Sequence, residues 1–170
     1  MNIDALNKLS EEALFDAFEK CCGSRSWIKA MVAGKPFTSS AQLCDLNEKV
    51  WNALAQKDWL EAFTHHPEIG DVDSLKKKFA STAHWAGDEQ QGAAQASEDV
   101  LVALKQGNEE YKRKFGFIFI VCATGKTAQQ MLDLLQQRLP NEADQEIVIA
   151  AAEQCKITDI RLNKLMSAQS

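Results

Sequence analysis

The sequence of 170 residues has no long apolar run, and its longest strongly apolar stretch is FIFIVCA at residues 117–123. A helix that spans a bilayer needs about 20 apolar residues, so this stretch is far too short. The N-terminal residues, MNIDALNKLSEE, lack the basic and apolar regions of a secretion signal. We therefore expect a cytoplasmic protein without membrane partners.

An excess of positive charge is also missing. The chain carries 19 Lys and Arg against 24 Asp and Glu, which gives a formal net charge of −5. Because a nucleic-acid partner requires a basic surface to meet its phosphates, this balance argues against nucleic acid. A small anionic ligand is still compatible with this net charge, because it needs only one or two local cations.

The cysteines and histidines are too few and wrongly spaced for a metal site. Five cysteines is an odd number, Cys21 and Cys22 are adjacent, and no CxxC occurs. Two of the three histidines, His65 and His66, are neighbours that would point apart. We expect no metal, and reduced cysteines that are mostly buried small apolar residues.

Helical patterning dominates what is present. Ser10, Ser39 with Gln42, and Thr127 with Gln130 are typical helix starts. Only residues 115–122, rich in aromatic and β-branched side chains, are typical of an extended segment. We predict an all-α fold, a compact bundle of roughly eight or nine helices with one buried extended segment, in a single domain over residues 1–170.

Three details of the later helices follow from local signals. Asp88 is expected to cap an alanine-rich helix that Gly107 ends, and residues 80–87 are expected to be irregular. Asn141, directly after Pro140, is expected to start the last helix.

The stretch IFIVCATGKT is similar to a strand entering a phosphate-binding loop. That loop needs a glycine five residues before its Gly-Lys-Thr glycine, and Ile120 stands there. We interpret Gly125 instead as the end of the extended run and Thr127 as a helix cap.

The stretch FTHHPEIGD places His66 directly before Pro67. One reading puts both histidines in the last turn of a helix, where the dipole favours a cation. The other is catalytic. Proline pushes the preceding residue toward extended geometry, which would hold His66 rigidly and leave His65 as the exposed member.

Two further positions have alternative readings. Glu89 complements a helix dipole, but the Gln90–Gln91 pair beside small residues also suits the approach of a ligand. Arg161 borders an apolar helix face, where its charged end either snorkels to water or offers a fork to a carboxylate.

Together, several segments resemble one family, 2-oxo-4-hydroxy-4-carboxy-5-ureidoimidazoline (OHCU) decarboxylase, the last enzyme of urate breakdown to (S)-allantoin. They are FTHHPEIG, Glu89–Gln90 before small residues, Tyr111 with KFGFIFIVC, and EQCKITDIRL near the end. The resemblance covers nearly the whole chain. It implies an all-α decarboxylase of a purine-derived small molecule that works without metal or organic cofactor. Members are often dimeric, which leaves a homodimer open.

The resemblance also implies roles for individual residues. His66 matches the family's proton-transfer histidine, with Glu89 as the carboxylate that supports it. Ala86 stands where the family has a serine, which puts one substrate hydrogen bond in question. The residues expected to contact substrate are Pro67, Ala86, Gln90, Phe119, Ile120, Val121, Cys122, Ala123 and Arg161.

Two rival interpretations compete with the enzyme. In the first, the chain is a non-catalytic helical interaction module in which His66 merely ends a helix. In the second, it is a decayed homologue that still binds ligand, with Ala86 marking the loss of activity. Measurements of ligand binding and of turnover distinguish the enzyme from these two alternatives.

Overall fold

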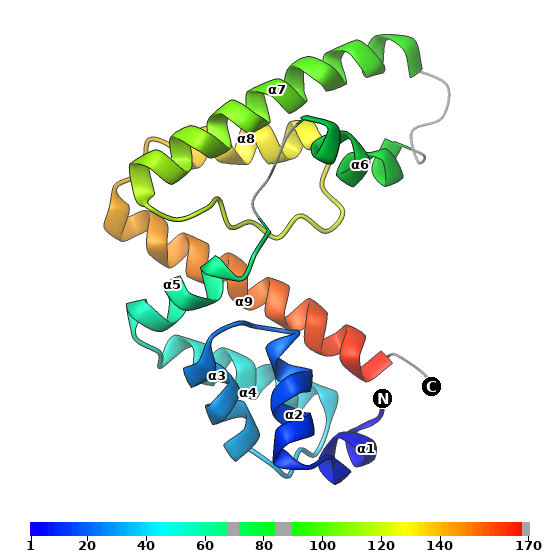
Figure 1. Ribbon diagram of the computed structural model, residues 1–170, viewed down its shortest axis with the longest axis vertical. Coiled ribbons are helices and arrows are strands. Elements are labelled where there is room, and N and C mark those ends of the chain that lie inside the picture. Colours follow the sequence, from blue (N-terminus) through cyan, green and yellow to red (C-terminus); the bar gives the residue numbers. More distant parts are fainter. Residues whose placement is uncertain (68–71, 84–89, 168–170) are drawn as a thin grey trace. The chain divides into compact units, whose positions relative to one another are not determined.

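The computed structural model describes residues 1–67, 72–83 and 90–167, without the side chains of residues 78–83 and 90–97. These described residues form α-helices and no β-strand (Figure 1). The helices are α1 (Ile3–Lys8), α2 (Glu11–Glu19), α3 (Arg25–Ala33), α4 (Ser40–Asn52), α5 (Gln56–Thr64), α6 (Val72–Ala83), α7 (Gln90–Phe115), α8 (Ala128–Arg138) and α9 (Ala143–Ser167). The all-α prediction is confirmed.

The chain divides into two compact units. Unit 1 comprises Met1–His66 and Ala151–Ser170, and unit 2 comprises Pro67–Ala150. Unit 1 contains α1 to α5 and the larger part of α9, whereas unit 2 contains α6, α7, α8 and the extended segment. The single domain over residues 1–170 stays a prediction.

Serine and threonine caps start the helices where the sequence indicates. The Ser10 side chain accepts a hydrogen bond from the Ala13 N–H at 3.2 Å and begins α2. At α8, the Thr127 hydroxyl accepts from the Gln130 N–H at 3.2 Å, and Gln130 Oε1 accepts from the Thr127 N–H at 2.9 Å. This reciprocal pair is the predicted capping box. Such local signals are reliable because cap and helix are adjacent in sequence.

In unit 1, buried polar bonds tie α9 to α3 and α4. The Trp27 indole donates to Asn47 Oδ1 at 2.8 Å, and Asn47 Nδ2 donates to Asp159 Oδ1 at 2.8 Å. The Trp51 indole donates to the Ala151 carbonyl at 2.8 Å. Because buried donors need partners, these bonds hold α9 in one register within the unit.

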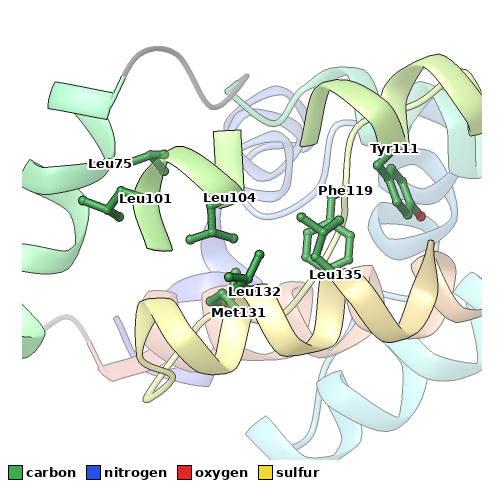
Figure 2. Packing of buried hydrophobic residues seen from close by; sticks show 8 residues of the cluster. All are labelled: Leu75, Leu101, Leu104, Tyr111, Phe119, Met131, Leu132 and Leu135. Atoms are coloured by element: carbon green, nitrogen blue, oxygen red, sulfur yellow. The ribbon is translucent and has the colours of Figure 1, made fainter. Parts of the chain in front are cut away.

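The core of unit 2 lies between α7 and α8, with contributions from α6 and the extended segment (Figure 2). The prediction that Gly107 ends a helix is wrong, since α7 continues to Phe115. A Cβ atom on Gly107 would lie 2.5 Å from Leu135 Cδ2 on α8. The glycine therefore serves close helix packing, which offsets its helix-propensity cost of about 1 kcal/mol.

Three other boundary predictions have mixed outcomes. Residues 80–83, expected to be irregular, belong to α6, whereas residues 84–87 and Asp88 lie outside the described residues. The last helix begins at Ala143, two residues after Asn141. The side chain of Asn141 instead donates to Glu146 Oε2 at 2.9 Å, so it serves the first turn of α9 from outside.

The cysteines behave as buried thiols. Cys21 and Cys22 are free and buried, and Cys44 and Cys155 are free and half-buried. Burial raises the pKa of Cys21 and of Cys22 to about 11, although the charge of Arg161 opposes the rise at both. At neutral pH they are protonated, so neither has the thiolate character of a nucleophile.

Candidate functional site

The end of α5 holds the two histidines. His65 is the C-cap residue of α5 and is exposed, whereas His66 is half-buried, as the sequence predicts. The His66 N–H donates to the Phe63 carbonyl at 3.3 Å, and the Phe63 side chain is buried. A buried aromatic on the last turn thus anchors the point from which His66 projects.

Gln154 on α9 is the residue that meets His66. The Nε2 atom of His66 is hydrogen-bonded to Oε1 of Gln154, which is only 1% exposed. Gln154 Nε2 donates to the Thr158 hydroxyl at 3.2 Å, and that hydroxyl donates to the Gln154 carbonyl at 3.0 Å. The imidazole is therefore held by an amide that is itself fixed, all within unit 1.

Gln154 is not among the site residues that the sequence predicts. A helical signal for it exists, because Gln154, Thr158 and Leu162 follow one another at four-residue spacing and all are buried. Two polar residues on a buried helix face require partners. The spacing does not reveal that one partner is a histidine 88 residues away.

Gly23 supports His65 from the turn after α2. A Cβ atom on Gly23 would lie 2.2 Å from Cγ and 2.6 Å from Cβ of His65. The backbone of Gly23 is outside the left-handed region, so the requirement for glycine is steric. The close approach lets the His65 ring lie against the main chain.

Replacing Gly23 by alanine is therefore expected to destabilise the protein by about 1–3 kcal/mol, the usual cost of overpacking. His65 cannot move easily, because its Cβ is one of the atoms in the clash. Urea unfolding measures the change. Stability should return in the double variant Gly23→Ala/His65→Ala, with His65→Ala alone as the control. An unchanged midpoint for Gly23→Ala would contradict this packing.

Arg161 lies on the same helix as Gln154 and Thr158. Its Nη1 donates to the Cys21 carbonyl at 3.1 Å. The guanidinium therefore binds a main-chain carbonyl, a contact that neither sequence reading included. Positions 154, 158 and 161 share one helix face, and the turn at residues 21–23 contacts Thr158 and Arg161 on it. Unit 1 thus places Arg161 on the face of α9 whose Gln154 binds His66.

The extended segment of unit 2 follows α7 after Gly116, whose φ of +80° favours glycine. Phe119, Ile120 and Cys122 are buried, and Val121 and Ala123 are half-buried. Two carbonyls of this segment accept hydrogen bonds from side chains: Ile120 accepts from Arg138 Nη1 and Cys122 from Lys126 Nζ, both at 2.7 Å.

A buried network of charged and polar side chains contacts this segment. Arg138 Nε is 2.5 Å from Glu146 Oε1, and the Tyr111 hydroxyl donates to the same oxygen at 2.6 Å. The guanidinium carbon also lies 4.6 Å from the centre of the Phe119 ring. Burial, followed by the hydrogen bond to Glu146, raises the pKa of Tyr111 well above its usual range. The phenol stays protonated and remains a donor.

The other predicted site residues are placed less completely. Ala86 and Glu89 lie outside the described residues, and Gln90 begins α7 with its side chain undescribed. Pro67 is exposed and is the first residue of unit 2. His66 and Arg161 belong to unit 1, and Phe119–Ala123 belong to unit 2.

Within residues 1–67, 72–83 and 90–167, no group of three or more His, Cys, Asp or Glu side chains is arranged to hold a metal ion. No helix in that part of the chain has the length and apolar character to cross a membrane.

Comparisons with known proteins agree on one family. The sequence profile of the family described as OHCU decarboxylase matches residues 7–163. The chain is 39% identical over 154 residues to the uric acid degradation bifunctional protein TTL of Arabidopsis thaliana, covering 89% of this chain and 47% of that protein. It is 28% identical over 168 residues to the OHCU decarboxylase of Amia calva, covering 98% and 95%. The chain thus spans about half of the bifunctional relative.

Solved structures agree with the sequence comparisons. A crystal structure of OHCU decarboxylase in the presence of (S)-allantoin matches with a TM-score of 0.71 at 38% identity, covering 94% of this chain and 99% of that one. A crystal structure of (S)-allantoin synthase matches with a TM-score of 0.73 at 18% identity, covering 98% and 54%. The second likeness concerns the fold alone.

Proposed function

Because this chain belongs to the OHCU decarboxylase family, we propose that it converts OHCU to (S)-allantoin and CO2 in urate degradation. The observation that carries the proposal is the family match over residues 7–163, which includes every position assigned to the site. OHCU decarboxylases are carboxy-lyases, so the chain is a member of an enzyme family. The half-buried His66, bound at one nitrogen by a buried amide, supplies a fitting acid–base group.

The reaction needs few chemical groups. The bond between the ring carbon and the carboxylate breaks, CO2 leaves, and the electron pair stays on the ring as an enolate-type charge. One proton is then delivered to one face of that carbon. Because the ring itself takes up the electron pair, the proposed reaction requires neither metal nor organic cofactor. The protein must hold the carboxylate out of plane, stabilise the oxyanion and supply the proton.

We assign the proton transfer to His66, since imidazole titrates near neutrality. Glu89 supports the imidazolium, and Gln90 holds the ureido ring by hydrogen bonds. Arg161 and the backbone of residues 119–123 complete the contacts, with Pro67 beside the histidine and Ala86 in place of the family serine. These roles rest on the sequence resemblance. A single domain, a homodimer and a cytoplasmic location, in keeping with the free thiols, are further proposals.

Turnover of freshly prepared OHCU tests the proposal. The expected result is faster CO2 release together with (S)-allantoin, followed by its circular dichroism. Uncatalysed protonation reaches both faces of the ring and gives a racemic product, so optical activity distinguishes catalysis from the background. Racemic product at the background rate would contradict the proposal. In that case, a rise in Tm with allantoin would favour the decayed homologue, and an unchanged Tm the interaction module.

A further inference from the structure

The hydrogen bond between His66 and Gln154 also bears on which nitrogen of the His66 ring carries the hydrogen. Gln154 and Thr158 are 1% and 0% exposed, so their polar atoms must be satisfied by protein groups. A glutamine side chain offers an oxygen that only accepts and a nitrogen that only donates. Which end faces His66 therefore decides whether the imidazole Nε2 donates or accepts.

Thr158 decides the orientation of the amide. A hydroxyl has one hydrogen, and that of Thr158 goes to the main-chain carbonyl of Gln154 at 3.0 Å. A helical threonine readily makes this bond to the carbonyl four residues earlier. The hydroxyl oxygen can then only accept, so Gln154 must turn its Nε2 toward Thr158, at 3.2 Å.

With its nitrogen toward Thr158, Gln154 presents its oxygen to His66 Nε2. An amide oxygen has no hydrogen to give, so the imidazole must donate. We propose that Gln154 is a positioning residue that fixes the neutral His66 ring in the tautomer with hydrogen on Nε2 and the lone pair on Nδ1. In a neutral histidine, the hydrogen bond made by one ring nitrogen sets which of the two nitrogens carries the hydrogen.

The consequence for catalysis rests on the proposed function. If His66 transfers the proton, the transfer takes place at Nδ1, while Nε2–H stays bound to the Gln154 oxygen in both charge states. A carboxylate in the place of Gln154 would be an acceptor as well, but with a full negative charge. The neutral amide orients the ring without adding a second negative charge near the departing carboxylate.

The experiment reads the tautomer directly. Two-bond proton–nitrogen correlation spectra of protein labelled with ¹⁵N-histidine distinguish the two neutral tautomers, and the His66 signals are assigned by their loss in His66→Asn. In the resting protein we expect Nε2–H. Gln154→Leu should abolish the preference and yield a tautomer mixture. Thr158→Val, which frees the amide to rotate, should also give a mixture, whereas Thr158→Ser should keep Nε2–H.

Kinetics supply the second readout. Gln154→Leu should lower kcat by about 10- to 100-fold with little change in KM, on the scale of a lost orienting hydrogen bond. Thr158→Ser should retain near-normal kcat, unlike Thr158→Val. Hydrogen on Nδ1 in the resting protein, or an unchanged tautomer in Gln154→Leu, would overturn the inference. If Gln154→Leu does not fold, the resting protein alone decides.

The catalytic role of His66 and the assignment of its tautomer can be contradicted independently. The spectra report the tautomer whether or not His66 takes part in the reaction. If Nε2–H is found but His66→Asn keeps full turnover, the catalytic role fails and the tautomer assignment stands. If His66→Asn is inactive but the hydrogen is on Nδ1, the catalytic role stands and the assignment fails.

Discussion

Replacing His66 by asparagine is expected to lower kcat for (S)-allantoin formation by about 10²- to 10⁴-fold, the usual contribution of a general acid–base group. Asparagine keeps a short polar side chain after α5, and its amide can bond to Gln154, so the fold should persist. It has no group that titrates near neutrality and cannot deliver the proton. Stopped-flow circular dichroism of the product measures the loss, and far-UV spectra check the fold.

His65→Asn is the matched control for this prediction. The same substitution one residue earlier changes an exposed side chain at the C-cap position of α5. We expect it to keep kcat within a few-fold of the original protein. Full stereospecific activity in His66→Asn would remove the proton-transfer role, and equal losses in both variants would indicate damage to the end of α5.

Glu146→Gln is expected to destabilise the protein by about 3 kcal/mol or more, because it leaves the Arg138 charge buried without its carboxylate. Glu146 is completely buried and accepts from Arg138, Tyr111 and Asn141. For a chain of this length the expected fall in Tm is roughly 6–12 °C. Thermal unfolding followed by circular dichroism measures it.

Glu98→Gln is the control with the same change of charge. Glu98 pairs with Lys76 at 3.1 Å, but the side chains of Glu98 and Lys76 are 59% and 47% exposed. Exposed pairs contribute little, so stability should change by less than about 1 kcal/mol. The double variant Arg138→Met/Glu146→Gln should recover part of the loss, since it removes the unpaired buried charge. Equal effects of Glu146→Gln and Glu98→Gln would contradict the network.

Local signals predicted the helices well. Ser10, Ser39 and Thr127 each cap the helix that follows, because a cap requires only a side chain and an N–H two or three residues away. The same local reasoning gave a wrong prediction at Gly107. Glycine is a common helix end, but here it lies inside α7, where α8 packs against it. This packing cannot be predicted from the neighbouring residues.

The site residues divide in the same way, into those that the sequence predicted and those that only the packing revealed. The His66–Pro67 pair and the family segments pointed to the histidine and predicted that His65 is the exposed neighbour. They did not reveal Gln154, or the Arg138 side chain that binds the Ile120 carbonyl. Arg138 resembles any basic residue in the last turn of a helix, where the dipole favours it.

By itself, the sequence determined that the chain is helical, where most helices begin, and that a histidine is held before a proline. These features depend on dihedral preferences and on hydrogen bonds between residues a few positions apart. Only the tertiary structure decided which buried amide holds the imidazole and which buried carboxylate neutralises Arg138. Hydrophobic periodicity shows that a helix face is buried, but the partner of a polar group on that face depends on the helices packed against it.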